Sequence, residues 1–335
     1  MTLTSLKHLS SRTAMPAGDI LRPDPQALQH STWTSAERKS LHEDYWGSFI
    51  FDFVKTLPAD SSFEEAWRSV HYHEFLRGSG EGRTFARRMT NWKSNFTRRG
   101  KLKNEADLVT VPFLPFLFED VSEPISLRVM CLLRKQLIGG LLDGIVPEKT
   151  ALFDLGSGWG RHSTMFAEKY PQLQVHAGEI SSGGQSVTRW FAERYGFSIQ
   201  AFPFDYLAWK DMVERVSACD REEIVIFTCH SIEQVTFADF DMWAALARLN
   251  KSVRFIHLEP VGWQISSNST SRFSRPPDPK QDAQWGYNKN LLSIVDSLKE
   301  QGLVENVVAK QDYIAFGNAY NSGTLVTFEN RRGSA

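Results

Sequence analysis

The stretch that decides the fold reads Thr150-Ala-Leu-Phe-Asp-Leu-Gly-Ser-Gly-Trp-Gly160 and continues as Arg161-His162-Ser163. Its first part is apolar, as in a strand that is buried on both faces of a sheet. Three alternating glycines follow, and then a helical pattern that lasts until Pro171. A glycine-rich turn between a buried strand and a helix lets a ligand approach exposed backbone N–H groups closely. The stretch therefore predicts a ligand-binding turn of the nucleotide type.

The spacing of the glycines separates this turn from two common alternatives. A dinucleotide fingerprint needs a further glycine where Arg161 stands, and a P-loop needs Gly-Lys-Ser/Thr, which does not follow. The pattern acid-x-Gly-x-Gly-x-Gly, with Asp154 as the acid, resembles the first motif of class I S-adenosylmethionine (SAM)-dependent methyltransferases. In that family the turn lies under the methionine part of SAM and the acid orients the turn and the ligand's amino group. The resemblance implies SAM as cofactor, bound by Asp154, Gly156, Gly158 and Gly160.

From Thr150 onward the sequence alternates between strand and helix patterns. Strands are expected at 151–155, 173–179, 198–204, 223–229, 253–259, 304–314 and 322–328, and helices near 160–169, 183–195, 207–217, 238–249 and 288–301. This alternation predicts an α/β fold with a doubly wound, mostly parallel sheet and helices on both faces. The last two strands have no helix between them and should form an antiparallel hairpin around Gly317–Ser322. Seven strands ending in such a hairpin resemble the Rossmann-like methyltransferase arrangement, over residues 123–330.

Acidic residues follow the second and third expected strands. In doubly wound sheets, ligands bind beyond the carboxyl ends of the strands, where the strand order reverses. Glu179, followed by Ile180, can accept hydrogen bonds from both ribose hydroxyls and resembles the second-motif acid of the family. NAD enzymes also place an acid here, so Glu179 alone does not identify the cofactor. Asp205 resembles the residue that accepts the adenine amino hydrogen bond, and Tyr206 is expected beside the ring.

The fourth expected strand runs into the polar sequence His230-Ser-Ile-Glu-Gln234, which should face the donor methyl group. His230 is the candidate general base, because the unperturbed pKa of histidine lies near neutrality. It also borders the expected cofactor position, and a positioning role is its alternative. Glu233 is a second catalytic candidate that can take a substrate cation, and Gln234 can supply a polar hydrogen bond.

Three further residues are expected around the substrate. Glu259 and Trp263, at and after the end of the fifth strand, should point into or over the pocket, and Tyr320 should close its edge from the hairpin. Residues 266–282 lack any period, which is typical of a functional lid or an insertion. With Glu233 and Glu259 nearby, a cationic or amino-acid-like methyl acceptor is favoured.

The chain before Thr150 divides into two predicted regions. Residues 1–34 are rich in Ser, Thr and Pro and predict a flexible arm. Residues 35–122 should form a helical region, with helices at 35–55 and 62–76, which serves as a lid, a substrate contact or a dimerisation surface. A homodimer is therefore among the expected assemblies.

Two local patterns in this region lead to specific expectations. The run 111–118 contains two prolines and predicts an extended segment between two layers and not a central strand. Ser122 should cap a helix over 125–142 with Pro124 in its first turn. His71 and His73 lie two apart on the second helix, so they cannot easily share a metal, and we interpret them as surface histidines.

Composition restricts the partners. Charges balance, at 38 Lys and Arg against 39 Asp and Glu, so nothing global favours nucleic acid or an anionic membrane. The segment 83–103 has eight basic residues, three aromatic residues and no acid, which suits a helix face, an acidic small molecule or RNA. The three cysteines lack metal-ligand spacing and predict free thiols, and no apolar run is long enough to span a bilayer. We expect a cytoplasmic protein without a metal.

These observations lead to one main hypothesis. The chain is expected to be an enzyme that transfers a methyl group from SAM to a small polar metabolite, such as an amino-acid-like or other biosynthetic intermediate. One alternative is an RNA or protein methyltransferase that uses the basic segment 83–103. The other is a methyltransferase-like scaffold without catalysis.

Overall fold

The computed structural model describes residues 34–77, 114–118, 121–125, 127–265, 287–316 and 322–331. The predicted arm up to residue 33, the basic segment 83–103, the aperiodic segment 266–282 and Tyr320 lie outside these residues. The predictions made for them therefore stay predictions.

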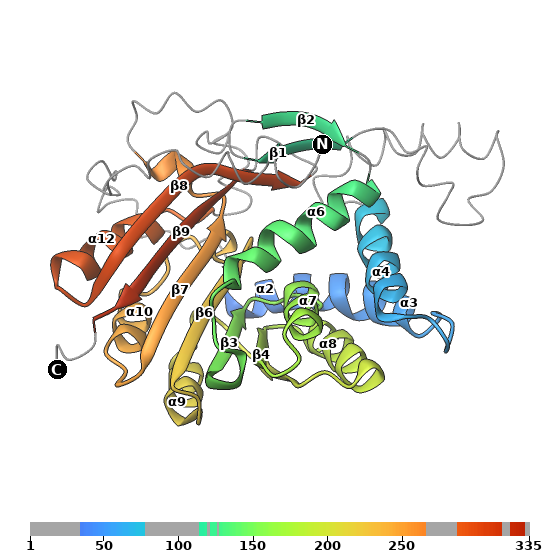
Figure 1. Cartoon of the computed structure of the whole chain (residues 1–335), viewed down its shortest axis with the longest axis horizontal. Coiled ribbons are helices and arrows are strands. Elements are labelled where there is room, and N and C mark those ends of the chain that lie inside the picture. Colours follow the sequence, from blue (N-terminus) through green and yellow to red (C-terminus); the bar gives the residue numbers. More distant parts are fainter. Residues whose placement is uncertain are drawn as a thin grey trace.

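A single sheet organises the described part of the chain (Figure 1). Its nine strands lie in the order β2-β1-β8-β9-β7-β6-β3-β4-β5. Their bounds are β1 (Leu114–Phe118), β2 (Val121–Ile125), β3 (Thr150–Leu155), β4 (Gln174–Glu179), β5 (Ile199–Pro203), β6 (Glu223–Cys229), β7 (Ser252–Glu259), β8 (Val304–Phe316) and β9 (Gly323–Asn330). The run from β5 to β7 is parallel, and β9 is antiparallel to both β7 and β8. Counted from β3, the order is 3-2-1-4-5-7-6, which is the class I methyltransferase fold, and the predicted fold and terminal hairpin are confirmed.

Helices cover both faces of the sheet because its strands are apolar on both. They are α6 (Leu127–Gly139), α7 (Arg161–Lys169), α8 (Ser182–Tyr195), α9 (Lys210–Ala218), α10 (Phe240–Ala247) and α12 (Leu291–Glu300). In β6, Ile224 and Ile226 join the core beneath α9, α10 and α12, whereas Val225 and Phe227 join the core beneath α6 and α7. The period of two along buried strands thus builds a three-layer α/β/α domain.

The strands β1 and β2 form a hairpin that extends the sheet, and this corrects two predictions. Ser122 and Pro124 lie inside β2, so they do not begin a helix, and α6 starts only at Leu127. Pro115 lies within β1, which pairs with strands on both sides, so this segment is not held between two layers. The sheet tolerates these prolines because Pro115 faces Pro124 and the ladder to β8 begins only at Phe116. Two facing prolines fit a pair that makes no ladder hydrogen bonds.

The N-terminal helices differ from the prediction in one respect. The helix expected over 35–55 is divided into α2 (Ser35–His42), a nine-residue π-helix η4 (Glu43–Phe51) and the short α3 (Asp52–Val54). Its start is confirmed, because Thr34 and Glu37 form a reciprocal capping box. The second helix is α4 (Phe63–Arg77), close to its predicted bounds.

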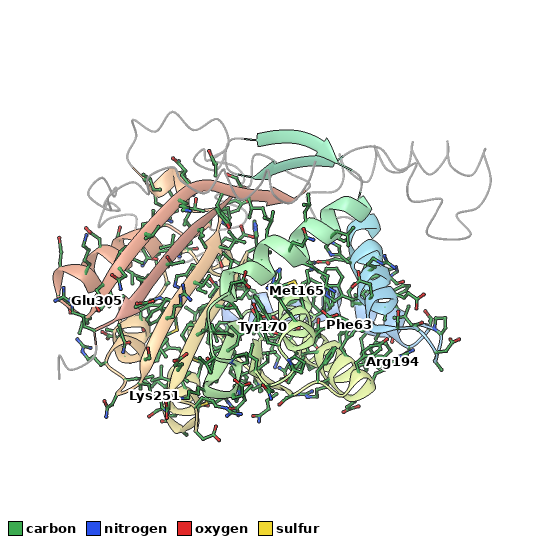
Figure 2. All side chains as sticks on the ribbon, viewed as in Figure 1. Phe63, Met165, Tyr170, Arg194, Lys251 and Glu305 are labelled. Atoms are coloured by element: carbon green, nitrogen blue, oxygen red, sulfur yellow. The ribbon has the colours of Figure 1, made fainter. Side chains whose placement is uncertain are left out.

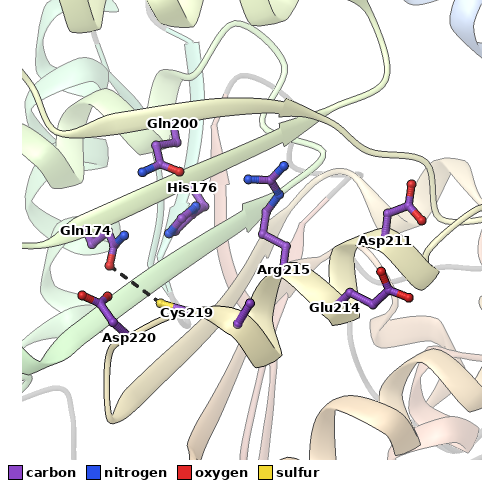
Figure 3. A pocket seen from close by; sticks show the side chains of 9 residues that line it. Gln174, His176, Gln200, Asp211, Glu214, Arg215, Cys219 and Asp220 are labelled. Carbon is purple, nitrogen blue, oxygen red and sulfur yellow. Dashed lines mark hydrogen bonds between the residues drawn. The ribbon is translucent and has the colours of Figure 1, made fainter.

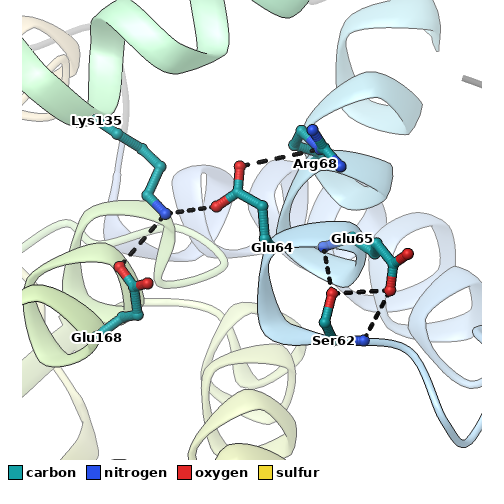
Figure 4. A network of polar contacts seen from close by, with 6 residues as sticks. All are labelled: Ser62, Glu64, Glu65, Arg68, Lys135 and Glu168. Carbon is teal, nitrogen blue, oxygen red and sulfur yellow. Dashed lines mark hydrogen bonds and ion pairs between the residues drawn. The ribbon is translucent and has the colours of Figure 1, made fainter. Parts of the chain in front are cut away.

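Aromatic and charged contacts fix α4 to the sheet domain. Phe63, which Figure 2 labels, meets the rings of Phe191, Tyr195 and Phe197 edge-on. The Lys135 ammonium on α6 lies 2.6 Å from a carboxylate oxygen of Glu64 and 3.3 Å from one of Glu168 on α7 (Figure 4). The helical region is therefore packed against α6, α7 and α8.

Of the two histidines of α4, His71 is buried and His73 is half-buried, which corrects their interpretation as surface histidines. His71 is buried and stacks on Trp67, and burial lowers its pKa well below the usual value. The His73 ring stacks on Phe49 and Phe53. The partners of His73 come from the first helices, whereas His71 is covered within the core, and the local pattern reveals neither environment.

Candidate cofactor site

The strand order reverses at β3, which has β4 on one side and β6 on the other. The carboxyl ends of these strands lead into the loops that carry most of the predicted site residues. The fold therefore brings the glycine turn, the loop after β4 and the loop after β6 to one edge of the sheet, where ligands of doubly wound sheets bind.

The glycine turn depends on glycine for its shape. Gly156, Gly158 and Gly160 all have left-handed backbones, with φ of 73°, 58° and 79°. A Cβ on Gly156 would come within 3.0 Å of Ser231 after β6, and one on Gly160 would come within 3.0 Å of Thr188 on α8. The turn is therefore packed against the loop after β6 and against α8. Only glycine, which has no Cβ and readily adopts a positive φ, fits at these positions.

Two buried carboxylates support the turn. Asp154 accepts a hydrogen bond of 2.6 Å from the Ser163 hydroxyl on α7. Glu179 accepts from the Gly158 N–H at 2.9 Å through Oε2, and from the Ser181 N–H and hydroxyl through Oε1. Burial raises the pKa of each carboxyl to about 7, against the opposing effect of these donors. Both acids therefore lie where the sequence placed them, in contact with the turn or with the helix that follows it.

The loop after β5 contacts the residues next to the glycine turn. Tyr206 is buried, and its hydroxyl donates to the Leu155 carbonyl at 3.0 Å and lies 2.8 Å from the Ser231 hydroxyl. Asp205 is half-buried, and its Oδ1 accepts from the Leu207 N–H at 2.9 Å. Ile180, after β4, is also half-buried. The Tyr206 hydroxyl thus connects the end of β3 to the loop after β6, whereas Asp205 and Ile180 keep accessible surface.

His230 begins the loop after β6 in an uncommon conformation. Its φ is 53°, in the left-handed region that non-glycine residues rarely adopt. Its Nδ1 lies 3.4 Å from Glu233 Oε1, and its side chain is 33% exposed. Burial opposes the imidazolium, but the charge and hydrogen bond of Glu233, together with the charge of Glu259, raise the pKa of His230. The imidazole is therefore accessible and oriented by a carboxylate.

The remaining substrate candidates separate into a structural acid and accessible groups. Glu259 is fully buried at the end of β7, and it accepts from the N–H groups of Ser231 and Glu233. Burial raises the pKa of this carboxyl to about 7. Gln234 is exposed and Trp263 is half-buried in the 3-10 turn η9 (Gly262–Gln264). Glu259 thus stabilises the loop after β6 through backbone N–H groups, whereas the sequence predicted that it points into or over the substrate pocket.

Sequence reasoning missed a contribution from the first helices. Trp46 lies against Gly158, where an added Cβ would be 3.2 Å from its ring. Arg38 Nη1 donates to the Gln234 carbonyl at 2.9 Å, and Glu43 accepts from the N–H groups of Ser182 and Gly183. The capping box at Thr34 marks the helix start, but no local signal identifies partners more than 100 residues away.

The residues around the turn fit a nucleoside-type cofactor. Glu179 Oε2 accepts the Gly158 N–H, and a carboxylate oxygen has capacity for a further donor such as a ribose hydroxyl. The Ser157 hydroxyl, within the turn, is buried and has no hydrogen-bond partner among the described residues. A polar group buried in this way favours a ligand that completes its hydrogen bonding.

A surface groove lies elsewhere, toward the amino ends of β4 and β5 (Figure 3). Its lining includes Gln174, Gln200 and, from α9, Asp211, Glu214 and Arg215. The amino ends of parallel strands are opposite the edge where doubly wound sheets bind ligands. The groove is therefore separate from the candidate site.

Comparisons with known proteins find similarity only to solved structures, at low sequence identity. No family model matches the chain, and no curated protein matches it. One similar solved structure is an O-methyltransferase family protein from Burkholderia thailandensis, with 12% identity, 62% of this chain and 59% of that chain covered, and a TM-score of 0.40. Another is geranyl diphosphate C-methyltransferase from Streptomyces coelicolor A3(2), in complex with Mg²⁺, geranyl diphosphate and S-adenosyl-L-homocysteine, with 11% identity, 70% and 86% covered, and a TM-score of 0.40.

A third similar structure is PigF with SAH, at 15% identity, with 61% of this chain and 57% of that chain covered and a TM-score of 0.38. The match spans less than two thirds of the length of the Burkholderia protein. The fold assignment depends on the strand order and not on these likenesses. In the part of the chain that the structure describes, no helix is long and apolar enough to cross a membrane.

Proposed function

We propose that this chain is an enzyme that transfers a methyl group from SAM to a small polar metabolite. The observation that carries the proposal is the turn after β3, which combines three left-handed glycines with the Glu179 carboxylate bound to the Gly158 N–H. This turn lies at the reversal of the strand order in a class I methyltransferase fold.

Residues from three loops would hold the cofactor. Glu179 and Ser157 offer polar atoms at the turn, and Asp205 and Ile180 keep accessible surface after the neighbouring strands. Asp154 supports the turn through Ser163. When bound, SAM supplies a methyl group already activated by its sulfonium, so the protein has to orient the acceptor and exclude water.

His230 and Glu233 are the groups proposed to act on the methyl acceptor. Glu233 lies beside Nδ1 of His230, which leaves Nε2 to take a proton from an acceptor that arrives protonated. Glu233 Oε2 is buried and has no hydrogen-bond partner among the described residues, so it can receive a donor such as an amino group. This supports an acceptor that carries an amino or other cationic group.

The test is calorimetric titration of the full chain with SAM and with S-adenosylhomocysteine. We expect micromolar binding that Glu179→Ala abolishes, because this change removes the acceptor at the turn, and that Asp154→Ala also abolishes. Glu214→Ala, in the distant groove, is the matched control and should bind as the wild type does. If the folded wild type binds neither compound, the proposal is wrong.

The alternatives from the sequence keep their own tests. An RNA or protein methyltransferase would depend on the basic segment 83–103, which lies outside the described residues. A scaffold without catalysis would bind SAM with no turnover on any acceptor.

A further inference from the structure

The first helices form a strap over the candidate cofactor site. We define this strap as residues 35–51, which comprise α2 and η4. It reaches the loops that follow three strands: the turn after β3 through Trp46, the start of α8 after β4 through Glu43, and the loop after β6 through Arg38. In Figure 1 the strap is the blue helix that passes behind β3, β4 and α7. One segment thus spans the edge where the cofactor is proposed to bind.

The contact of Glu43 with α8 is the most specific of these. Its carboxylate accepts from the Ser182 N–H at 2.7 Å, from the Gly183 N–H at 3.2 Å and from the Ser182 hydroxyl. These N–H groups belong to the first two residues of the 14-residue α8. The first N–H groups of a helix have no acceptor within the helix, and this end carries partial positive charge. A carboxylate is therefore well matched to this end of α8, and the contact is at a water-accessible position that can break and re-form.

The local structure of the strap also indicates a functional role. Glu43 opens η4 and Trp46 lies within it, and η4 runs for nine residues as a π-helix. Helical turns of this kind are rare and occur frequently at functional sites. A segment held in this form keeps its geometry through tertiary contacts, and Glu43 supplies one at its first residue.

We propose that the strap is a gate over the cofactor site and that the Glu43–α8 contact holds the gate closed. This inference rests on the proposed function. While Glu43 is bound to Ser182 and Gly183, Trp46 lies on Gly158 and covers the turn. Cofactor enters and leaves when Glu43 releases α8, and re-formation of the contact closes the site against water. Glu43 is therefore a positioning residue that acts through Trp46 and does not itself have to touch the cofactor.

The gate makes a kinetic prediction that a purely structural contact does not make. If opening limits exchange in both directions, weakening the Glu43 contact raises the association and dissociation rates together and leaves the equilibrium affinity almost unchanged. If Glu43 only supports the bound state, its loss raises the dissociation rate alone and weakens binding in proportion.

The experiment measures binding of a fluorescent S-adenosylhomocysteine analogue to the full chain by stopped flow. Glu43→Gln keeps the shape of the side chain but removes its charge, and we expect both rates to rise about tenfold, as for the loss of hydrogen bonds to a charged group. Ser182→Ala removes one donor and should shift both rates in the same direction by less. Glu37→Gln is the matched control on the same strap, because its carboxylate accepts only from Thr34 in the described contacts, and it should leave both rates unchanged.

The outcomes distinguish the gate from the proposed function. Binding of the analogue with unchanged rates in Glu43→Gln, or with a faster dissociation rate only, overturns the gate and leaves the proposed function in place. Failure of the folded wild type to bind either the analogue or S-adenosylhomocysteine overturns both. Thermal unfolding of each variant checks that it is folded.

Discussion

His230 shows how a single backbone angle links structure to the proposed chemistry. Its φ of 53° directs the chain from the end of β6 into the loop that Glu259 holds through Ser231 and Glu233. A side chain in this region costs about 1–2 kcal/mol, which glycine does not incur. The strain is located beside an accessible imidazole with a raised pKa. Such a combination is typical of functional sites, where the surrounding contacts hold an unfavourable conformation.

The strain at this residue can be measured with two substitutions. We expect His230→Gly to be more stable than His230→Ala by about 1 kcal/mol, because both remove the imidazole but only glycine relieves the positive φ. Urea unfolding of both variants measures this difference. Both should reduce methyl transfer to a similar extent, of the order of 10²–10⁴ if the base is lost. Equal stability of the two variants would mean that the backbone relaxes when the imidazole is removed.

Individual residues of the candidate site were predictable where their position in the fold follows from the pattern of strands. Glu179 and Asp154 were found because an acid at a strand end can be read from the order of apolar and polar residues. Their hydrogen bonds to Gly158 and Ser163 were not predicted. Glu259 was expected beside the substrate, but its carboxylate faces backbone N–H groups of the loop after β6. The direction of a side chain depends on neighbouring loops, and the sequence of one strand does not contain that information.

At the scale of elements, the parallel strands were predictable and the N-terminal helices only partly so. The strands β3, β6 and β7 lie within one residue of their expected bounds, because burial on both faces requires a continuous apolar run. The hairpin of β1 and β2 was missed because its prolines argue against a central strand, and only the partner strands show how they fit. The π-helix η4 likewise depends on contacts with α8. Elements fixed by tertiary partners are those that sequence patterns miss.

The attachment of α4 to the sheet domain gives a prediction at this scale. Lys135 on α6 pairs with Glu64 on α4 and Glu168 on α7, and its ammonium also lies 5.3 Å from the centre of the Phe63 ring. Both carboxylates are partly exposed, so solvent weakens the pairs. We expect Lys135→Ala to lower the free energy of unfolding by about 1 kcal/mol through the combined network.

The control for this network is a pair in open solvent. Lys149 lies 3.9 Å from Glu222, and their side chains are 60% and 75% exposed. Lys149→Ala should therefore change the unfolding free energy by less than about 0.5 kcal/mol. Urea unfolding of both variants gives the comparison, and equal losses would show that Lys135 contributes no more than an exposed lysine.

At the scale of the whole molecule, two sets of buried ionisable groups make stability depend on pH in opposite directions. The carboxyl groups of Asp154, Glu179 and Glu259 have pKa values raised by burial to about 7. Buried histidines have lowered pKa values, to about 4 for His176, to about 3 for His257 and well below the usual value for His71 and His162, again because of burial. The two sets share strands, with His176 and Glu179 on β4 and His257 and Glu259 on β7, and they act on the same unfolding equilibrium.

The sign of each contribution follows from which state binds more protons. Between pH 4.5 and 7, the folded carboxyl groups hold protons that the unfolded chain has released, so their contribution to stability is lost as the pH rises through about 7. His230, whose pKa is also raised, acts in the same direction. The histidines with lowered pKa act oppositely. Below 6.5 the unfolded chain binds protons that the four folded histidines His71, His162, His176 and His257 do not. These are one more than the protons that the three carboxyl groups retain, so stability is lost as the pH falls below about 6.

We therefore expect the melting temperature to pass through a maximum between about pH 6 and 7, falling on the alkaline side through the carboxyl groups and on the acid side through the histidines.

The variant His176→Phe tests the contribution of the histidines separately from that of the carboxyl groups. The His176 ring stacks on Phe153 and neither of its nitrogens has a hydrogen-bond partner among the described residues, so phenylalanine can replace it in the core. The melting temperature of the variant should fall less steeply than that of the wild type as the pH drops below about 6. Above the maximum its slope should equal that of the wild type, since the three carboxyl groups are unchanged. Differential scanning calorimetry from pH 5 to 8.5 measures both slopes. A parallel shift of the whole curve would show that His176 has the same pKa in the folded and the unfolded chain, and a monotonic wild-type curve would contradict the opposing shifts themselves.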